Sequence, residues 1–227
     1  MERQNAVTSE PVLDLGDLLM SGAIFHEKQS LMLCAIHSLN NLLCNEPTSG
    51  ASTEPMFTKA HFDRLAEAKH KEQADFGESS FFNPHRSKLR LGDFDVVVLE
   101  SAVNMAGCSW QWFNAKNCAA TIDLAESSSL VGVVVNVKKA QLFGAWKSNH
   151  WYAVRRCHGL LLNLDSKLDA PELLGDDASC HAHLQTILDA DGHLFLVHRG
   201  AEERAGVGRP EGTVPEPEPE PEKSPGL

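Results

Sequence analysis

Cys34 is the residue that this sequence places best for nucleophilic chemistry. Apolar residues recur at steps of three or four over residues 33–43, which is the period of an α-helix with one buried face. Cys34 therefore lies in the opening turns of a predicted helix, where unpaired backbone N–H groups and the helix dipole favour a thiolate over a thiol. A small cysteine buried in the core is the alternative interpretation of this position.

His150 and Asp165 could supply the two groups that a cysteine nucleophile requires. His150 heads a segment of period-two alternation, and Asp165 ends the next apolar segment. A histidine can act as a base or as a cationic partner of the thiolate, provided that an acceptor fixes its ring and its tautomer. If Asp165 accepts from one ring nitrogen, the other can face Cys34. A surface histidine on a polar strand face is the alternative.

A β-hairpin would bring this pair together. Arg156-Cys157-His158-Gly159 has the length of a four-residue hairpin loop. With Arg155 opposite Leu160, the numbers of paired residues sum to 315, so that His150 stands opposite Asp165 with the two Cβ atoms about 4.5–5.5 Å apart. The same register gathers four apolar residues on the opposite face of the hairpin: Trp151, Ala153, Leu162 and Leu164.

Gln29 stands five residues before Cys34, just ahead of the predicted helix. Its side-chain amide could join the backbone N–H of Cys34 in an oxyanion hole, where one such donor contributes about 2.7–4 kcal/mol to the transition state. Considered by itself, a glutamine in a loop is more commonly a solvated residue.

The elements that must position these side chains come as helices first and strands afterwards. This order indicates an α+β fold in which N-terminal helices precede an antiparallel sheet, rather than an alternating parallel design. A hydrophobic staple of Phe57 and Phe62 marks the start of the second helix at its N-cap, Thr58. We expect helices at 33–45, from 58 onward, at 95–106 and at 178–190, and strands at 109–113, 130–137, 151–155, 160–165 and 193–198.

Composition excludes several classes of protein. The chain has 227 residues, is 42% hydrophobic, and carries a formal net charge of −11, which makes it a poor candidate for binding nucleic acid. No run reaches the ~18 apolar residues of a membrane span, and no secretion signal is visible. Six cysteines without a pattern then indicate free thiols in a reducing compartment. We expect the cytoplasm, with the nucleus as the alternative.

The chain divides into three segments. Residues 23–199 form the predicted domain, and residues 1–22 are expected to be a flexible N-terminal extension. Residues 200–227 include an alternation of Pro and Glu over 215–222, which repels itself and cannot build a core. We therefore expect a disordered or extended Pro/Glu-rich tail.

Two further clusters offer other chemistry. His37 follows Cys34 by three residues on the same predicted helix and could perturb its thiol, but a base on an opposing element is better placed for catalysis. Cys180-His181-Ala182-His183 suggests a metal site, yet no second cluster at zinc-finger spacing accompanies it. We therefore expect His37 to be structural or to modulate substrate contact, and we expect neither a metal nor a cofactor.

Several stretches of the chain, spread over residues 23–199, resemble the Josephin family. They are IFHEKQ at 24–29, LCAIHSLNNLL at 33–43, NPHRS at 83–87, NHW at 149–151, NLDSKL at 163–168 and Pro171-Glu172. The short Josephin proteins are more similar than the long polyglutamine-bearing member. Residues 45–56 and 70–80 are longer than the usual helical segment of the family, which could alter the arm that closes over the ubiquitin tail.

The resemblance implies a papain-like fold and a thiol-dependent deubiquitinase. Cys34 falls on the nucleophile of the family, His150 on its general base, Asp165 on the third triad position, where the family has Asn or Asp, and Gln29 on its oxyanion glutamine. The expected partners are ubiquitin and ubiquitinated proteins, bound by a monomer. Two alternatives stay open: a ubiquitin-binding module that merely retains the fold, and another papain-like acyl transferase.

Overall fold

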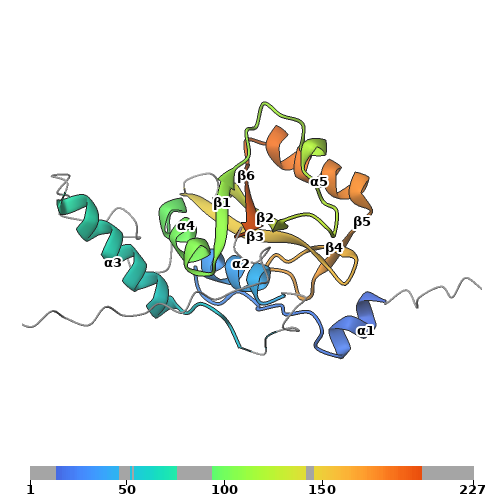
Figure 1. Cartoon of the computed structure of the whole chain (residues 1–227), viewed down its shortest axis with the longest axis horizontal. Coiled ribbons are helices and arrows are strands. Elements are labelled where there is room, and N and C mark those ends of the chain that lie inside the picture. The colour runs from blue at the N-terminus through green and yellow to red at the C-terminus, as the bar shows by residue number, and fades with distance from the viewer. Residues whose placement is uncertain (1–13, 46–51, 53, 76–93, 142–145, 201–227) are drawn as a thin grey trace, which may run out of the picture.

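A six-stranded antiparallel sheet with helices on both faces positions every candidate residue (Figure 1). The computed structural model describes residues 14–45, 52, 54–75, 94–141 and 146–200. The strand order is β1-β6-β2-β3-β4-β5. The strands are β1 (Cys108–Trp112), β2 (Leu130–Gln141), β3 (Trp146–Cys157), β4 (Leu160–Asn163), β5 (Glu172–Gly175) and β6 (His193–Arg199). The helices are α1 (Leu15–Met20), α2 (Cys34–Leu43), α3 (Lys59–Asp75), α4 (Val96–Met105), the 3₁₀ turn η1 (Ala119–Thr121) and α5 (Asp177–Asp189).

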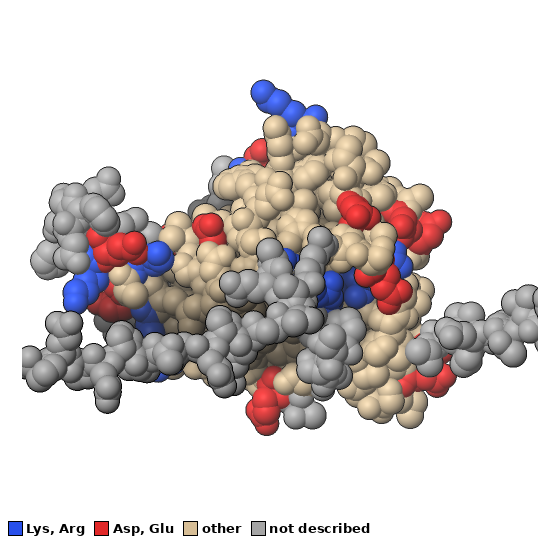
Figure 2. All heavy atoms as spheres, in the orientation of Figure 1, with Lys and Arg blue, Asp and Glu red and all other residues tan. Residues whose placement is uncertain are grey.

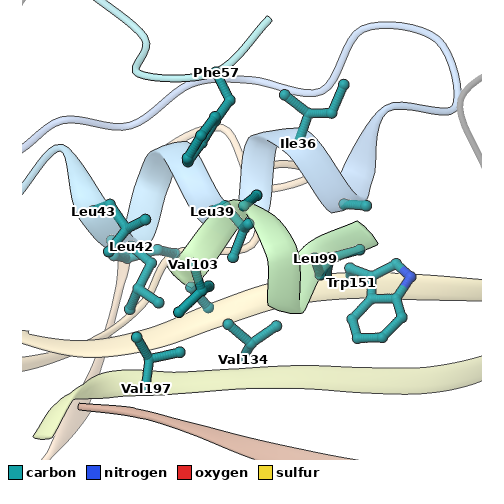
Figure 3. Packing of buried hydrophobic residues seen from close by; sticks show 14 of the residues in the cluster. Ile36, Leu39, Leu42, Leu43, Phe57, Leu99, Val103, Val134, Trp151 and Val197 are labelled. Atoms are coloured by element: carbon teal, nitrogen blue, oxygen red, sulfur yellow. The ribbon is translucent and has the colours of Figure 1, made fainter. Parts of the chain in front are cut away.

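Each face of the sheet is buried in a core of its own. Trp151 and Ala153 of β3 belong to the core under α2 and α4, whereas Tyr152 and Val154 belong to the core under α5. This alternation follows from the period-two geometry of a strand. Figure 3 shows the first core, in which residues of α2 and α4 point toward the strands: Leu39, Leu42 and Val103 lie over Val134 and Val197.

Helix α2 packs unusually close to β2 at Gly132. A Cβ atom at this position would lie 2.6 Å from Cδ1 of Leu42 and 2.6 Å from the carbonyl oxygen of Val154. Only glycine allows this approach without displacement of backbone, and every residue of α2 is buried as a result of its packing.

The three N-terminal helices predicted from periodicity and capping, and the sheet, are confirmed. The rings of Phe57 and Phe62 meet edge to face at 5.8 Å across the start of α3, as the staple requires. Asp95 caps α4 by accepting from the N–H groups of Val97 and Val98, and Gly107 ends it with φ of 74°. The α+β class is therefore as expected, although β2 and β3 extend further than predicted.

The packed part of the chain begins earlier than expected. Helix α1 lies within the segment that was predicted to be a flexible extension, and Leu18 is only 4% exposed in the core under α2. The spacing of Leu15, Leu18 and Leu19 gives this short helix its apolar side. Strand β5 was not predicted either; it adds to the edge of β4. The NPHRS loop and the Pro/Glu-rich tail lie outside the described residues.

The register predicted for the β3–β4 hairpin is wrong. Cys157 pairs with Leu160 and Arg155 with Leu162, so the paired numbers sum to 317 rather than 315. The loop has two residues instead of four, because His158 and Gly159 both adopt positive φ, 50° and 81°, in the manner of a type I′ turn. A shift of two residues preserves the faces. Trp151, Ala153, Leu162 and Leu164 therefore still share one core, as predicted.

Helix α3 projects from the body of the domain, with only its first turns near the core (Figure 1). Charged residues dominate it: its sequence is KAHFDRLAEAKHKEQAD. Among the residues that the structure describes, no helix is both long and apolar enough to cross a bilayer.

Replacing Gly132 should destabilise the domain through the α2–β2 contact. Gly132→Ala places a methyl group against Leu42 and the backbone of Val154, and overpacking of this kind costs about 1–3 kcal/mol. Urea unfolding followed by circular dichroism measures the change in the free energy of unfolding. Gly16→Ala on the exposed side of α1 is the control and should be neutral or stabilising by up to about 1 kcal/mol. Equal stability of Gly132→Ala and the wild type would contradict the close approach.

Candidate active site

Cys34 is the first residue of α2 and lies against the strand that carries His150. Its side chain is almost buried, with the residue 6% exposed, and its Sγ lies 3.9 Å from the backbone carbonyl oxygen of Asn149 on β3. The position of Cys34 at the helix N-terminus is as predicted, and its role as the nucleophile stays a prediction. The first N–H groups of an α-helix have no partner within the helix, and the helix dipole places partial positive charge at this end, which favours a thiolate at Cys34.

His150 and Asp165 form a buried pair. Nε2 of His150 lies 2.9 Å from Oδ1 and 2.8 Å from Oδ2 of Asp165, and the histidine is only 1% exposed. The carboxylate accepts from Nε2, which fixes the tautomer of a neutral ring with its lone pair on Nδ1. Nδ1 is buried and has no hydrogen-bond partner among the described residues. One ring nitrogen is thus anchored and the other is left able to take up a proton.

Asp165 reaches His150 from a loop rather than from a paired strand position. In the observed register the residue opposite His150 would be number 167, but β4 ends at Asn163. The backbone N–H of Leu164 still donates to the carbonyl of Ala153, at 2.8 Å, and the chain turns after this bond. The predicted contact is therefore present, although the cross-strand geometry from which it was predicted is not.

The Asp165 loop is held by hydrogen bonds on both sides. Oδ1 of Asn163 accepts from the N–H of Asp165 at 3.1 Å, and Oδ1 of Asp165 accepts from the N–H of Lys167 at 2.9 Å. The amide of Asn163 in turn donates to Glu172 on β5 at 3.1 Å. The unpredicted strand β5 therefore supports the carboxylate that orients His150.

Gln29 lies beside this loop. Its backbone N–H donates to the carbonyl of Ser166 at 2.7 Å, and its side-chain Nε2 donates to the carbonyl of Leu31 at 2.9 Å. Leu31 holds φ of 54°, which is uncommon for a leucine and turns the chain sharply between Gln29 and α2. One of the two N–H groups of the Gln29 side chain is thus engaged, whereas its Oε1 is buried without a hydrogen-bond partner among the described residues. The oxyanion role of Gln29 stays a prediction.

Three asparagines of α2 and its C-terminus, which the sequence analysis did not single out, join the segments around the site. Asn41 donates to the carbonyl of Leu164 at 3.0 Å and accepts from the N–H of Glu27 at 2.6 Å. The side-chain amide of Asn45 accepts from the N–H of Phe25 and donates to its carbonyl. The side-chain amide of Asn40 makes the same two hydrogen bonds with the N–H and the carbonyl of Phe57. Asparagine is unfavourable within helices, so three of them in twelve residues were a signal of tertiary hydrogen bonding.

Burial makes two other thiols poor nucleophiles. It raises the pKa of Cys180 to about 11, with Arg156 opposing the shift, and it also raises the pKa of Cys44. His26 contacts the backbone carbonyl of Asp165 at 3.1 Å, but burial lowers its pKa and keeps it neutral near pH 7. These groups therefore do not compete with the pair of Cys34 and His150.

The histidines near Cys180 have other partners. His181 contacts the carbonyl of Ile122 at 2.9 Å, and His183 contacts the hydroxyl of Tyr152 at 3.4 Å. Over the described residues, no group of three or more His, Cys, Asp or Glu side chains is arranged to hold a metal ion.

Comparison with known proteins places this arrangement in a family. The family model described as Josephin matches residues 29–198. The chain belongs to the Josephin family. It is 33% identical over 172 residues to a Josephin-like protein of Arabidopsis thaliana, which covers 74% of this chain but only 45% of that protein. It is 31% identical over 188 residues to Josephin-2 of Homo sapiens, over 80% of this chain and 89% of that one. It is 30% identical over 185 residues to ataxin-3 of Homo sapiens, over 78% of this chain and 46% of that one.

Josephin membership confirms the resemblance predicted from the motifs and the α+β, papain-like fold class. It also supports a deubiquitinase-family function. Cys34, His150 and Asp165 all lie within the matched range, and Gln29 is its first residue.

Removing the support of Asp165 should cost stability. Asn163→Ala leaves the buried N–H of Asp165 without its acceptor, which typically costs about 1–3 kcal/mol in the free energy of unfolding. Urea unfolding measures this change in the free energy of unfolding. Glu172→Gln keeps an oxygen acceptor for Asn163 and should stay within about 0.5 kcal/mol of wild type. If Asn163→Ala is as stable as wild type, the loop does not depend on this hydrogen bond.

Proposed function

We propose that this chain is a deubiquitinating cysteine protease that hydrolyses isopeptide, peptide or thioester bonds at the C-terminal glycine of ubiquitin. The observation that carries the proposal is the buried contact of both Asp165 oxygens with Nε2 of His150, beside the helix N-terminus that bears Cys34. A buried histidine anchored at one nitrogen only, next to a thiol, is the arrangement that thiol-dependent hydrolysis requires.

Acylation uses the thiolate of Cys34 as the nucleophile. Its sulfur attacks the carbonyl carbon of the terminal glycine, and the carbonyl oxygen takes the negative charge. The backbone N–H of Cys34 and the amide of Gln29 donate to this oxyanion. The C–N bond then breaks, and the departing lysine amine takes the proton that His150 carries at Nδ1, which leaves a thioester on Cys34.

Deacylation returns the enzyme to its starting state. Neutral His150 removes a proton from water through Nδ1, and the water oxygen attacks the thioester carbonyl. The C–S bond breaks, ubiquitin leaves as the carboxylic acid, which gives its proton to solvent and becomes a carboxylate, and the thiolate and the imidazolium are restored. Asp165 holds the ring in one tautomer throughout and stabilises the imidazolium.

The surface and the cysteines are consistent with this class of substrate and with the expected compartment. On the face seen in Figure 2, the described Lys and Arg side chains do not gather into a broad patch, and acidic side chains are interspersed among them. In the sequence, the exposed residues Glu172, Asp176 and Asp177 stand in β5 and at the start of α5. A nucleic-acid surface would need clustered positive charge. All six cysteines are free thiols, which suits a reducing compartment such as the cytoplasm or nucleus.

A C-terminally electrophilic ubiquitin probe separates this proposal from its two rivals. The wild-type chain should form a covalent adduct that peptide mapping assigns to Cys34. The Cys34→Ala variant should bind ubiquitin with unchanged affinity and form no adduct, because alanine preserves the helix and removes the nucleophile. Cys157→Ala is the matched control of a buried cysteine away from the site and should be labelled like wild type. Binding without labelling would support a binding module, and neither binding nor labelling would support a different acyl transferase.

Substitutions of Asp165 should lower the hydrolytic activity to different extents. Asp165→Asn retains an oxygen that accepts from Nε2 of His150 and should keep part of the activity, whereas Asp165→Ala should lose more because the ring is no longer oriented. Hydrolysis of ubiquitin carrying a C-terminal fluorophore measures kcat/KM. The double variant His150→Ala/Asp165→Ala should be little worse than His150→Ala, because residues that act as a unit are not additive. Additive losses in folded variants would show that the two side chains work independently.

A further inference from the structure

His37 binds the loop that carries Gln29. It lies on α2 one turn after Cys34 and is 4% exposed. Its Nε2 accepts from the backbone N–H of Ser30 at 3.1 Å, and the hydroxyl of Ser30 lies 3.4 Å from the same nitrogen. A side chain of the nucleophile helix therefore holds the residue next to Gln29. Because this nitrogen is occupied by a donor from the loop, His37 is not placed to serve as the base.

Glu27 faces the other ring nitrogen of His37. Nδ1 of His37 lies 2.9 Å from Oε2 of Glu27, in a close but bent contact. Burial opposes ionisation of Glu27, but the contacts with His37 and Asn40 outweigh it and lower the pKa of the carboxyl. A carboxylate at this position attracts the ring proton to Nδ1, and the lone pair needed by Ser30 then remains on Nε2.

Glu27 is itself fixed to α2 at both its side chain and its backbone. Nδ2 of Asn40 donates to Oε2 of Glu27 at 2.8 Å. The N–H of Glu27 donates to Asn41 at 2.6 Å, and its carbonyl accepts from the same amide at 3.2 Å. The position of the ring of His37 is therefore determined from both sides, and so is the position of Ser30.

We propose that His37 and Glu27 are a positioning pair that locks the 29–31 loop onto α2 and so holds the amide of Gln29 at the oxyanion site beside Cys34. This inference rests on the proposed hydrolase function and adds residues to it. Neither His37 nor Glu27 touches the reacting atoms; the pair acts through Gln29. An oxyanion donor contributes about 10²–10³ in kcat, so loss of its positioning should be visible in turnover rather than in ubiquitin binding.

Two substitutions of His37, each of which can keep one of its two contacts, test the proposal. His37→Gln can place its amide oxygen near the position of Nε2 and still accept from Ser30, whereas the shorter His37→Asn can reach Glu27 but not Ser30. We expect His37→Gln to keep kcat within about threefold, and His37→Asn and His37→Leu to lose about 10–100-fold. The affinity for ubiquitin, measured in the Cys34→Ala background, should change less than about twofold. His198→Leu, at a half-buried histidine on β6, is the control and should turn over like wild type.

A double-mutant cycle that combines substitutions of His37 and Gln29 distinguishes a positioning role of His37 from general structural damage. In the Gln29→Ala background, His37→Asn should cause no further loss of kcat, because the group that it positions is already absent. If His37→Asn lowers kcat equally in the wild-type and Gln29→Ala backgrounds, the proposal is overturned. A wild-type kcat in the His37→Asn variant would also overturn it. If His37→Leu fails to fold, the comparison of kcat between His37→Gln and His37→Asn still tests the proposal. Absence of labelling of wild-type Cys34 by the ubiquitin probe would instead reject the hydrolase function itself.

Discussion

Helix α2 is buried along its entire length, and this constraint shapes the rest of the site. Every residue from Cys34 to Leu43 is buried, yet four of the ten are polar. A buried polar group without a partner costs free energy comparable to a lost hydrogen bond or more, so each must find one inside the protein. Ser38 bonds within α2 and Asn40 bonds the backbone of Phe57. His37 and Asn41 instead bond the segments that carry the candidate catalytic residues Gln29 and Asp165.

Stability and catalytic geometry are consequently linked through the same contacts. Asn41 joins the 24–29 segment to the loop of Asp165, and His37 joins α2 to the loop of Gln29. Gly132 lets α2 approach the sheet closely at Leu42 and Val154, and the same two strands, β2 and β3, pair along their length, with Val137 opposite His150. The thiol, the imidazole and the carboxylate are therefore held by a core rather than by flexible loops, which suits chemistry that depends on fixed distances.

The sequence was sufficient to predict what depends on local patterns. The periodicity and capping signals located α2, α3 and α4, and strand patterns located every strand but β5. The pairing of His150 with Asp165 was predicted from a register that is wrong by two residues. The contact is nevertheless present. An even shift keeps the side chains on the same face, and the chain turns after Leu164 and brings the carboxylate of Asp165 to His150.

Local sequence patterns could not predict the contacts between residues that lie far apart in the sequence. The type I′ turn was missed because His158, a non-glycine residue with positive φ, occupies its first position. Strand β5 is only four residues long and largely exposed, and only its pairing with β4 defines it. The asparagines of α2 bind groups far away in sequence, up to 123 residues in the case of Asn41, so local propensity marked them as unfavourable without showing their partners.

The most direct test compares Cys34 with an exposed cysteine of the same chain. Iodoacetamide at pH 6 reacts with thiolates, and peptide mapping gives the ratio of labelling at Cys34 to labelling at the exposed Cys118. If the N-terminus of α2 and His150 activate Cys34, this ratio exceeds one in the wild type despite the burial of Cys34, and it falls below one in His150→Ala. Faster labelling of Cys118 in the wild type, or an unchanged ratio in the variant, would contradict the account.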